Sequence, residues 1–424
     1  MREDFVQSVW KYQLFDRKNL YSKDGSKIEI VHQGFLQHHS GPDFSAAKIK
    51  IDDTLWVGNV EIHLQSRDWN VHKHFLDDAY NNVILHVVFK DDNTPCKTEN
   101  GRVIPCIEIG PRISEQVLSK YEHLVQDLSI LPCADVWPRL KEYEINEYLI
   151  QLALQRIEEK LLPIKHRLGH TKSHWEQVCF EFLCRHMGFH VNAEPMERLA
   201  RSIPVEIIHK NADKPLLIDA LLFGQAGMLE RSFIDDYPNE LKSNYRFLKK
   251  KYNLNSIDQA NWKFAKLRPL NFPSIRIAQL SSIMYHRTHL FQDCLHSNGM
   301  NHLKEFLKTN VNAYWENHYV FDKESSPCNK NLGAESIEKI LLNTLLLLWI
   351  CYGQNNNEID YINKAIDLME EIKAEKNMYT HVYECTGYKA SNAMQTQGLR
   401  FLWENYCDEK KCLNCNIGIK SLNI

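Results

Sequence analysis

The sequence lacks a hydrophobic segment long enough to cross a lipid bilayer. Its longest apolar run, Ile340 to Tyr352, is too short for a transmembrane helix and is interrupted by Asn343 and Thr344. The charged start of the chain, Met1 to Asp4, is not followed by the apolar core of a signal peptide. We therefore expect a cytoplasmic protein without a membrane partner, in which the apolar run forms a buried helix.

The dense cysteines of a secreted disulfide scaffold are also missing. The chain has 12 cysteines in 424 residues, and all but four stand singly among apolar neighbours. Such thiols are typical of reduced, buried positions in a cytoplasmic protein.

A strong charge of either sign is absent as well. The formal net charge is −3, which excludes a generally basic protein and limits any nucleic-acid surface to a local patch. The sequence has no internal repeat, and its hydrophobic share of 44% is ordinary for a globular protein. A chain of 424 residues therefore predicts two or three folded units.

Residues 1–110 have the pattern of a small sheet with flanking helices. Apolar residues from Phe5 to Phe15 recur at helical spacing, and residues 66–82 are polar and part-helical. Strands are predicted at 27–31, 47–51, 56–64, 83–89 and 103–109. A turn at 52–53 makes two of them a hairpin. The apolar run 83–89 is typical of a central strand, and Pro105 indicates an edge for the last one.

Long helical patterns dominate residues 143–424. They cover 145–162, 174–187, 240–251, 275–290, 336–352, 360–375 and 394–406. Residues 111–142 contain three prolines and form a connector. The predicted fold class is therefore α+β, with a small mixed sheet and flanking helices followed by a mostly helical domain that ends in a cysteine cluster.

Two acids and a histidine form the first candidate site, which we predict to be catalytic. Asp43 opens the second of these strands, while Glu61 and His63 lie two apart on the third and so point to one face. Pairing of the strands would bring Asp43 to Glu61, and two carboxylates suit Mg²⁺ or Mn²⁺ with positions left for water and phosphate. The alternative is that both acids are solvated or paired with nearby lysines.

A secondary candidate site follows at His72, His74 and Asp77. One helical turn would place His74 and Asp77 on the same face, where imidazole and carboxylate could complete a transition-metal site or contact a phosphate. The alternative is that the histidines cap a turn beneath the sheet. His38 and His39, earlier in the chain, could reach the same cleft.

The spacing of the acids also carries a resemblance. With Pro42-Asp43, then Glu61-Ile62-His63, and the order helix, three strands, helical segment, strand, the N-terminal part resembles the PD-(D/E)XK nuclease superfamily. This resemblance implies that Asp43 and Glu61 hold the metal ion. A lysine two residues after the glutamate positions the attacking water in that superfamily, and here His63 takes its place. A neutral imidazole could accept a proton near pH 7, and Lys48 or Lys50 could supply the missing charge.

A further set of motifs extends through the chain. It comprises Gly41-Pro42-Asp43-Phe44, the segments 56–63, 68–74, 83–88, 222–227 and 268–273, and Tyr406-Cys407. Together these motifs resemble an uncharacterised bacterial family, the domain of unknown function 2851. The resemblance covers nearly the whole chain and implies no established activity.

A basic and aromatic stretch at 244–276 is the candidate nucleic-acid surface. Its cations would neutralise phosphates beside rings that stack on bases. The proposed contacts are Arg246, Lys249, Lys250, Trp262, Lys263 and Arg268. The alternative is an amphipathic helix with a solvated lysine face and its rings in the core. A turn predicted at 222–227 lacks the spacing of a phosphate-binding loop.

The last candidate site is a group of cysteines near the C-terminus. Cys407, Cys412 and Cys415 have the spacing C-x4-C-x2-C, and Cys385 is the candidate fourth ligand. Close cysteines in a reduced compartment commonly hold Zn²⁺ or an iron–sulfur cluster, and the Lys410-Lys411 pair would lower the pKa values of the thiols. The alternative is a set of redox-labile or structural thiols.

These sites lead to three functional hypotheses. The first is a nuclease-like hydrolase that cleaves phosphodiester bonds of nucleic acid with Mg²⁺ or Mn²⁺. The second is a non-catalytic nucleic-acid-binding or scaffold protein on a degenerate nuclease fold, which the histidine at position 63 favours. The third is an enzyme acting on a small phosphate ester, which requires a narrow pocket over Glu61. The sequence leaves the oligomeric state open.

Overall fold

The computed structural model describes residues 1–37, 41–127, 129–285, 287 and 289–423, and the chain forms two compact units. The first unit comprises Met1–Leu149, Lys376–Lys389 and Leu399–Ile424, and the second comprises Ile150–Glu375 and Ala390–Gly398. The cysteine-bearing C-terminal segment therefore belongs to the same unit as the N-terminal sheet. This grouping matters for the sites below, since each of them lies within one unit.

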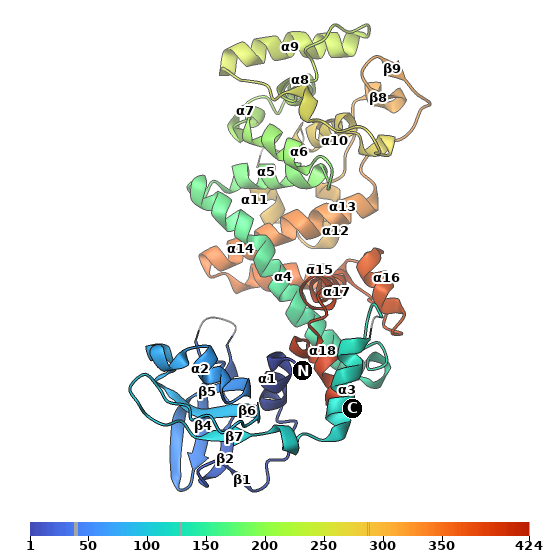
Figure 1. The fold of residues 1–424 in the computed structure, drawn as a ribbon. Coiled ribbons are helices and arrows are strands. Elements are labelled where there is room, and N and C mark those ends of the chain that lie inside the picture. Colours follow the sequence, from blue (N-terminus) through green and yellow to red (C-terminus); the bar gives the residue numbers. More distant parts are fainter. Residues whose placement is uncertain (38–40, 128, 286, 288, 424) are drawn as a thin grey trace. The chain divides into compact units, whose positions relative to one another are not determined.

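A mixed sheet forms the centre of the first unit, as the fold class predicted. Its strands are β1 (Leu20–Tyr21), β2 (Lys27–His32), β3 (Phe35–Leu36), β4 (Phe44–Ile51), β5 (Thr54–Gln65), β6 (Val83–Lys90) and β7 (Cys106–Glu108). They are ordered β1-β2-β4-β5-β6-β7, with β3 also paired to β4. The pairs from β1 to β5 are antiparallel, whereas β5–β6 and β6–β7 are parallel. Figure 1 shows β4, β5 and β6 side by side.

The predicted hairpin and central strand are both confirmed. Ile51 pairs with Thr54 across the turn, where Asp52 adopts a left-handed conformation with φ of 52°. The first six residues of β6 are all buried, because strands flank it on both sides and other elements cover its faces. Its continuous apolar run follows from that position. The strand near residue 105 is shorter than predicted and lies at the edge of the sheet, as Pro105 indicated.

Helix α1 (Glu3–Lys11) packs its apolar side on the sheet. Phe5, Val9 and Trp10 are completely buried in one core with Val60 and Ile62 of β5. Side chains alternate along a strand, so Glu61 and His63 point to the opposite face. The fold thereby separates an apolar face that stabilises the unit from a polar face that carries the candidate site.

Shorter elements complete the first unit. They are α2 (Asp68–Val71), 3-10 turns at His74–Leu76, Asp78–Tyr80, Gly110–Arg112, Trp137–Arg139 and Cys412–Asn414, α3 (Glu115–Gln126), α16 (Met378–Glu384), a π-helical turn at Trp403–Cys407, and α18 (Asn416–Asn423). The predicted connector 111–142 thus contains a full helix, α3, which Ser114 caps by accepting a hydrogen bond from the Val117 amide. α3 packs against α18 (Figure 1).

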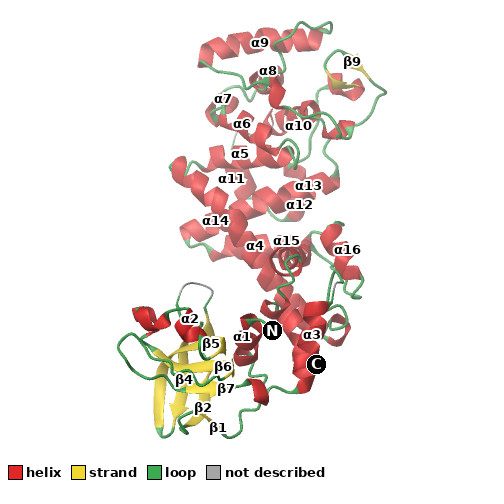
Figure 2. Cartoon of the chain, in the orientation of Figure 1, coloured by secondary structure: helices red, strands yellow, loops and turns green. Residues whose placement is uncertain are grey.

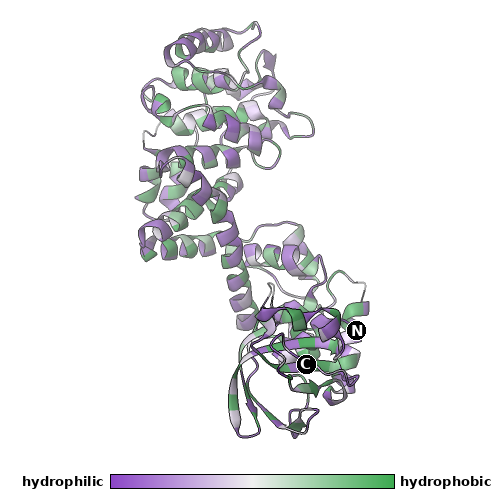
Figure 3. Ribbon diagram, turned by 60° about the vertical axis from the view of Figure 1, so that its left-hand side comes forward, coloured by the Kyte–Doolittle hydropathy of each residue, from purple (hydrophilic) through white to green (hydrophobic). Residues whose placement is uncertain are grey.

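The second unit is built mostly of helices. They are α4 (Glu142–His170, which starts before the boundary of the unit), α5 (Trp175–Met187), α6 (Ala193–Arg201), α7 (Val205–His209), α8 (Pro215–Gln225), α9 (Asp236–Tyr252), α10 (Pro273–Tyr285), α11 (Leu290–Leu295), α12 (Met300–Phe306), α13 (Ala334–Ile340), α14 (Leu346–Asn356), α15 (Ile359–Glu371) and α17 (Ala393–Leu402). A small hairpin, β8 (His318–Val320) with β9 (Lys323–Glu324), and 3-10 turns at Gln259–Asn261, Pro269–Asn271 and Ala313–Asn317 interrupt them (Figure 2). Hydrophobic and hydrophilic residues lie side by side along these helices (Figure 3).

The predicted helix at 336–352 is confirmed, with a π-helical turn, Leu341–Leu345, joining α13 to α14. Two details of the helical prediction were wrong. The pattern at 275–290 is not one helix, because α10 ends at Tyr285 and α11 begins at Leu290. The predicted turn at 222–227 is largely the end of α8, whose Gly224 allows the Tyr245 ring to pack where a Cβ atom would lie.

Within the part of the chain that the structure describes, no helix combines the length and the apolar character that crossing a membrane requires.

Candidate metal centre

Asp43 and Glu61 are brought together by the pairing of β4 with β5. Phe44 is opposite Val60 in this antiparallel pair. Asp43, one residue before Phe44, therefore lies opposite Glu61, one residue after Val60. The Asp43 amide donates to Glu61 Oε2 at 2.9 Å, and the Ile62 amide donates to Asp43 Oδ2 at 2.9 Å. Gln7 of α1 donates its side-chain amide to Asp43 Oδ1, also at 2.9 Å. Both carboxylates are therefore fixed by the backbone of the neighbouring strand.

Burial makes these carboxylates hard to ionise. Glu61 is only 5% exposed, and burial raises its pKa to about 8 even though the Asp43 amide favours the ionised form. Burial and then the charge of Glu61 raise the pKa of Asp43 to about 7. Glu3, in the first turn of α1, has its pKa raised to about 7 by burial and by Asp43. A cation bound beside these three acids would favour their ionised forms and offset the repulsion between them.

Three histidines lie over Glu61. His63 Nε2 lies 3.1 Å from His72 Nδ1. The same nitrogen lies 3.6 Å from Glu61 Oε1. His74 Nε2 is 3.3 Å from Glu61 Oε1, yet it is buried without a hydrogen-bond partner. The ligand atoms of the three histidines all lie within 4.8 Å of one another. Among the described residues His74 Nε2 makes no hydrogen bond, so its lone pair is available to a metal ion.

The segment after β5 turns these histidines towards the sheet. Asp68 accepts a hydrogen bond from the Gln65 amide at 2.9 Å, and α2 begins there. Trp69 is completely buried and donates its indole N–H to the Lys97 carbonyl at 2.9 Å. Lys73 adopts a left-handed conformation with φ of 62°, between the two histidines of the loop. The tight turn places His72 and His74 on the same side as Glu61.

A second layer of side chains holds His63. Its Nδ1 lies 2.8 Å from His86 Nε2, and His86 Nδ1 lies 3.2 Å from Cys96 Sγ. Burial lowers the pKa of His63 to about 2 and that of His86 to about 3, so both rings are neutral. In this chain of hydrogen bonds the Nδ1–H of His63 donates to His86 Nε2, and the Nδ1–H of His86 donates to Cys96 Sγ. The other nitrogen of His63, Nε2, then carries a lone pair, and this lone pair faces Glu61. Such outer partners fix the tautomer of metal-ligating histidines.

The set of donors suits a transition metal better than magnesium. Three imidazole nitrogens and one carboxylate oxygen are ligands that Zn²⁺ or Mn²⁺ accepts, whereas Mg²⁺ prefers oxygen and retained water. Glu61 Oε1 faces the imidazoles, while Oε2 accepts the Asp43 amide. Asp43 would therefore support Glu61 as a ligand, while the two-acid site for Mg²⁺ or Mn²⁺ stays a prediction.

The remaining residues of the predicted cluster make no contact with Glu61 among the described residues. Asp77 is exposed and caps a 3-10 turn by accepting the Ala79 amide at 2.9 Å, while its own amide donates to the His74 carbonyl at 3.3 Å. Lys48 is exposed and Lys50 half-buried, and no contact joins either to Glu61 among the residues with a described position. His38 and His39 fall outside the described residues. Sequence reasoning missed Glu3 and the Gln7 contact because only tertiary packing brings α1 to the sheet.

The candidate nucleic-acid residues have different surroundings. Arg246, Lys249 and Lys250 are exposed on α9, whose Tyr245 and Leu248 are buried. Trp262 is only 6% exposed and donates to the Ala226 carbonyl at 2.8 Å, so its ring belongs to the core. Lys263 and Arg268 are exposed in the connection to α10. The amphipathic alternative therefore describes α9 and Trp262 better than a stacking surface does.

The cysteines divide into two groups. Cys385 is exposed, and its thiol donates to the Val382 carbonyl at 2.9 Å. Cys407, Cys412 and Cys415 are at least half-buried in the first unit, close to a fourth thiol, Cys133. Lys410 lowers the pKa of Cys412, as predicted, but burial outweighs this effect and raises the pKa to about 11.

A comparison with protein families gives one match. The model of a family described as "Protein of unknown function (DUF2851)" matches residues 3–378, which is most of the chain. No curated protein and no solved structure among those compared matches it.

Proposed function

We propose that this chain, which belongs to the DUF2851 family, is a metal-dependent hydrolase that cleaves phosphodiester bonds of nucleic acid. One observation carries the proposal. His63, His72 and His74 place their ligand atoms within 4.8 Å of one another, and Glu61 Oε1 lies 3.3 Å from the unpartnered Nε2 of His74. These four side chains would hold Mn²⁺ or Zn²⁺.

The roles of the residues follow from their positions. When bound, a divalent ion would activate water and offset the negative charge of a phosphodiester group. Asp43 keeps Glu61 in place through the two backbone hydrogen bonds, and His86 keeps His63 in one tautomer. Glu3 Oε1, 3.9 Å from His63 Nε2 on a side chain that is 37% exposed, is the carboxylate placed to accept a proton from water.

The resemblance to the PD-(D/E)XK nucleases supports phosphodiesters as the substrate class. Asp43 and Glu61 lie on adjacent strands of a mixed sheet, where that resemblance expects its metal-binding acids. The histidines add nitrogen ligands that the short motif does not include. The active ion is therefore proposed to be Mn²⁺ or Zn²⁺ rather than Mg²⁺.

A non-catalytic binding protein is the second candidate. The observation in its favour is the position of His63, which the resemblance assigns to lysine, together with the lack of any lysine contact to Glu61 in the described part of the chain. Such a protein would bind nucleic acid through the same sheet without cleaving it.

Metal-dependent cleavage tests the proposal directly. Chelator-treated protein is expected to be inactive on a panel of single- and double-stranded DNA and RNA, and Mn²⁺ or Zn²⁺ is expected to restore at least about 100-fold more cleavage than Mg²⁺, because imidazole ligands disfavour magnesium. A small activated phosphodiester in the same panel detects a closed active site. Binding of nucleic acid without turnover in any metal would favour the second candidate and contradict the first.

A further inference from the structure

Four thiols of the first unit, one of them far from the other three in sequence, interact electrostatically with one another. Cys407 ends the π-helical turn Trp403–Cys407, and Cys412 and Cys415 flank the next 3-10 turn, where the Cys415 amide donates to the Cys412 carbonyl at 3.2 Å. Cys133 lies far earlier in the chain and is 6% exposed. It interacts electrostatically with Cys412 and Cys415, and Cys407 interacts with all three of the others.

The hydroxyl of Tyr383 lies among these thiols. Its oxygen is 3.2 Å from Cys407 Sγ, and it also interacts with Cys415 and Cys133. The Tyr383 side chain is completely buried, and its ring centroid is 5.2 Å from that of Trp137. The Gly418 amide donates to Cys415 Sγ at 3.5 Å. Hydroxyl and amide donors aimed at sulfur are partners that a thiolate accepts better than a neutral thiol does.

A thiophilic metal deprotonates its cysteine ligands and would make use of the hydroxyl and amide donors around these sulfurs.

We propose that Cys133, Cys407, Cys412 and Cys415 hold an iron–sulfur cluster, with Cys133 in the position that the sequence assigned to Cys385. Four sulfurs around one zinc ion would be about 3.8 Å apart, from a Zn–S distance of about 2.3 Å. Among the described residues, only the three histidines form a group of three ligand atoms within 4.8 Å. The thiols are therefore spaced more widely than a single ion requires, which suits a polynuclear cluster.

Two matched serine variants test this ligand set. The full-length protein, purified without oxygen, is expected to contain iron and acid-labile sulfide and to show the visible absorption of a cluster. Cys133→Ser is expected to lower the iron and sulfide contents at least about tenfold, and Cys385→Ser is expected to leave them unchanged. Cys412→Ser, at a less buried position, serves if Cys133→Ser fails to fold.

Each other outcome overturns the proposal. Zinc without acid-labile sulfide in the wild-type protein would show that the four cysteines hold a zinc ion and no iron–sulfur cluster. Wild-type protein without any bound metal would show that the cysteines do not form a metal site. Loss of iron in Cys385→Ser with retention in Cys133→Ser would show that the sequence prediction had the right ligand. None of these results depends on hydrolytic activity.

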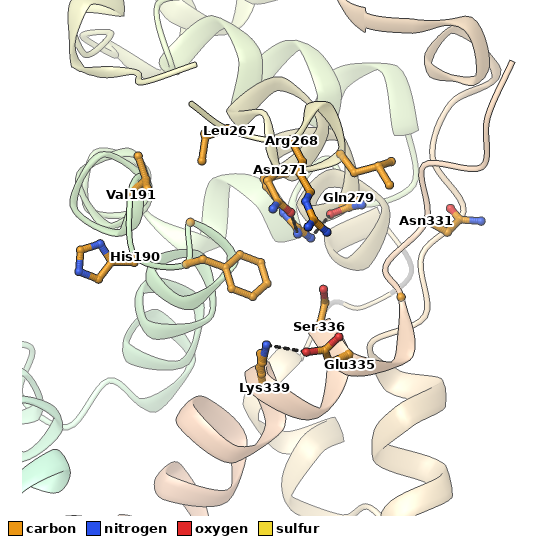
Figure 4. Close-up of a pocket in the computed structure, with 15 residues that line it drawn as sticks. His190, Val191, Leu267, Arg268, Asn271, Gln279, Asn331, Glu335, Ser336 and Lys339 are labelled. Atoms are coloured by element: carbon orange, nitrogen blue, oxygen red, sulfur yellow. Dashed lines mark hydrogen bonds and ion pairs between the residues drawn. The ribbon is translucent and has the colours of Figure 1, made fainter. Parts of the chain in front are cut away.

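A different observation supports a second inference, in the second unit. A cavity of about 600 Å³ lies between the loop after α5, the turn Pro269–Asn271, α10 and α13. Figure 4 shows Arg268, Asn271 and Gln279 on one side of it and Ser336 and Lys339 on the other. This volume is in the range of pockets that bind small organic ligands.

Arg276 is a buried cation in the wall of this cavity. It is 5% exposed, its guanidinium lies 4.4 Å from the centre of the Phe189 ring, and it donates to Gln279 at 2.9 Å and to Asn271 at 2.6 Å. Among the described residues, its buried Nε has no hydrogen-bond partner and no carboxylate pairs with the guanidinium. Burial lowers its pKa to about 10, so it remains charged at neutral pH. A buried charge is normally paired, and here the counter-ion is missing.

We infer that the cavity binds the phosphate group of a small ligand, the size of a mononucleotide, on Arg276. The rim residue Arg268 is exposed on the same side and would approach the same anion. The acid in the lining, Glu335, is already paired with Lys339 at 2.8 Å on the opposite side. A planar guanidinium binds phosphate through two parallel hydrogen bonds, and each Nη of Arg276 carries a second hydrogen beside the one donated to Gln279 or Asn271.

Calorimetric titration with a nucleoside monophosphate, inorganic phosphate, citrate and a short single-stranded DNA tests this inference. The monophosphate is expected to bind most tightly. Arg276→Gln is expected to weaken it about 100-fold and Arg268→Ala about tenfold, since hydrogen bonds to charged groups are lost. Lys323→Ala, an exposed cation of β9 outside the cavity lining, is the control. Unchanged affinity in both arginine variants, or binding of citrate alone, would overturn the inference.

Discussion

Glu61→Gln is expected to reduce phosphodiester cleavage at least about 1,000-fold while the protein stays folded. The substitution keeps the shape of the side chain and an oxygen that accepts the Asp43 amide, but it replaces the oxygen that faces His63 and His74, and that would ionise when a cation binds, with an amide nitrogen that cannot bind a metal ion. Loss of one charged ligand weakens the hold on the ion and the stabilisation of the transition state, and groups of this kind contribute several kcal/mol. Cleavage rates with saturating Mn²⁺, compared at equal folded protein, measure the effect.

Asp77→Asn is the matched control for this variant. Asp77 belongs to the same acid and histidine cluster in the sequence, but it is exposed and caps a turn. Its replacement is expected to change cleavage less than about twofold, because an exposed cap contributes to local stability rather than to the ligand set. Full activity in Glu61→Gln would refute the assignment of the centre. Equal losses in both variants would indicate general damage to the fold.

The sheet was predictable because its strands carry local patterns. Phe44, Ala47 and Ile49 alternate with polar residues and bury one face of β4, and β6 is apolar because it lies inside the sheet. Helix α3 was missed since prolines on both sides of it suggested a connector. The break between α10 and α11 was missed because apolar residues continue across it, so the hydrophobic pattern alone could not show where the helix ends.

The candidate centre was predictable only in part. The hairpin brings the two strands together, but the contact between Asp43 and Glu61 also needs the register shift between Phe44 and Ala47, because the register of the turn alone would place Asp43 opposite Ile62. The approach of Glu3 to His63, and the layer of His86 beneath it, depend on how separate elements pack. The position of Cys133 also could not be predicted from the sequence. Nothing in its surroundings in the sequence resembles the motif at residues 407–415, and folding brings it there.

Trp69→Ala is expected to cost about 3–5 kcal/mol of folding free energy, the usual range for a buried tryptophan. The indole is completely buried, and its ring lies 5.2 Å from that of His74 and 5.5 Å from that of His86. Its removal would also leave the Lys97 carbonyl without its donor. Denaturant unfolding of the metal-free protein measures this loss, and Leu76→Ala, at a side chain 66% exposed, should change it little.

The same variant separates positioning from simple stability. If Trp69 holds the turn that carries His72 and His74, the folded variant should bind Mn²⁺ about 10–100-fold more weakly, as when supporting residues of other metal sites are replaced. The Glu61→Gln protein should instead lose metal affinity without losing stability. Wild-type affinity in folded Trp69→Ala would show that β5 alone orients the ligands, and the loop histidines would then have to be removed from the centre.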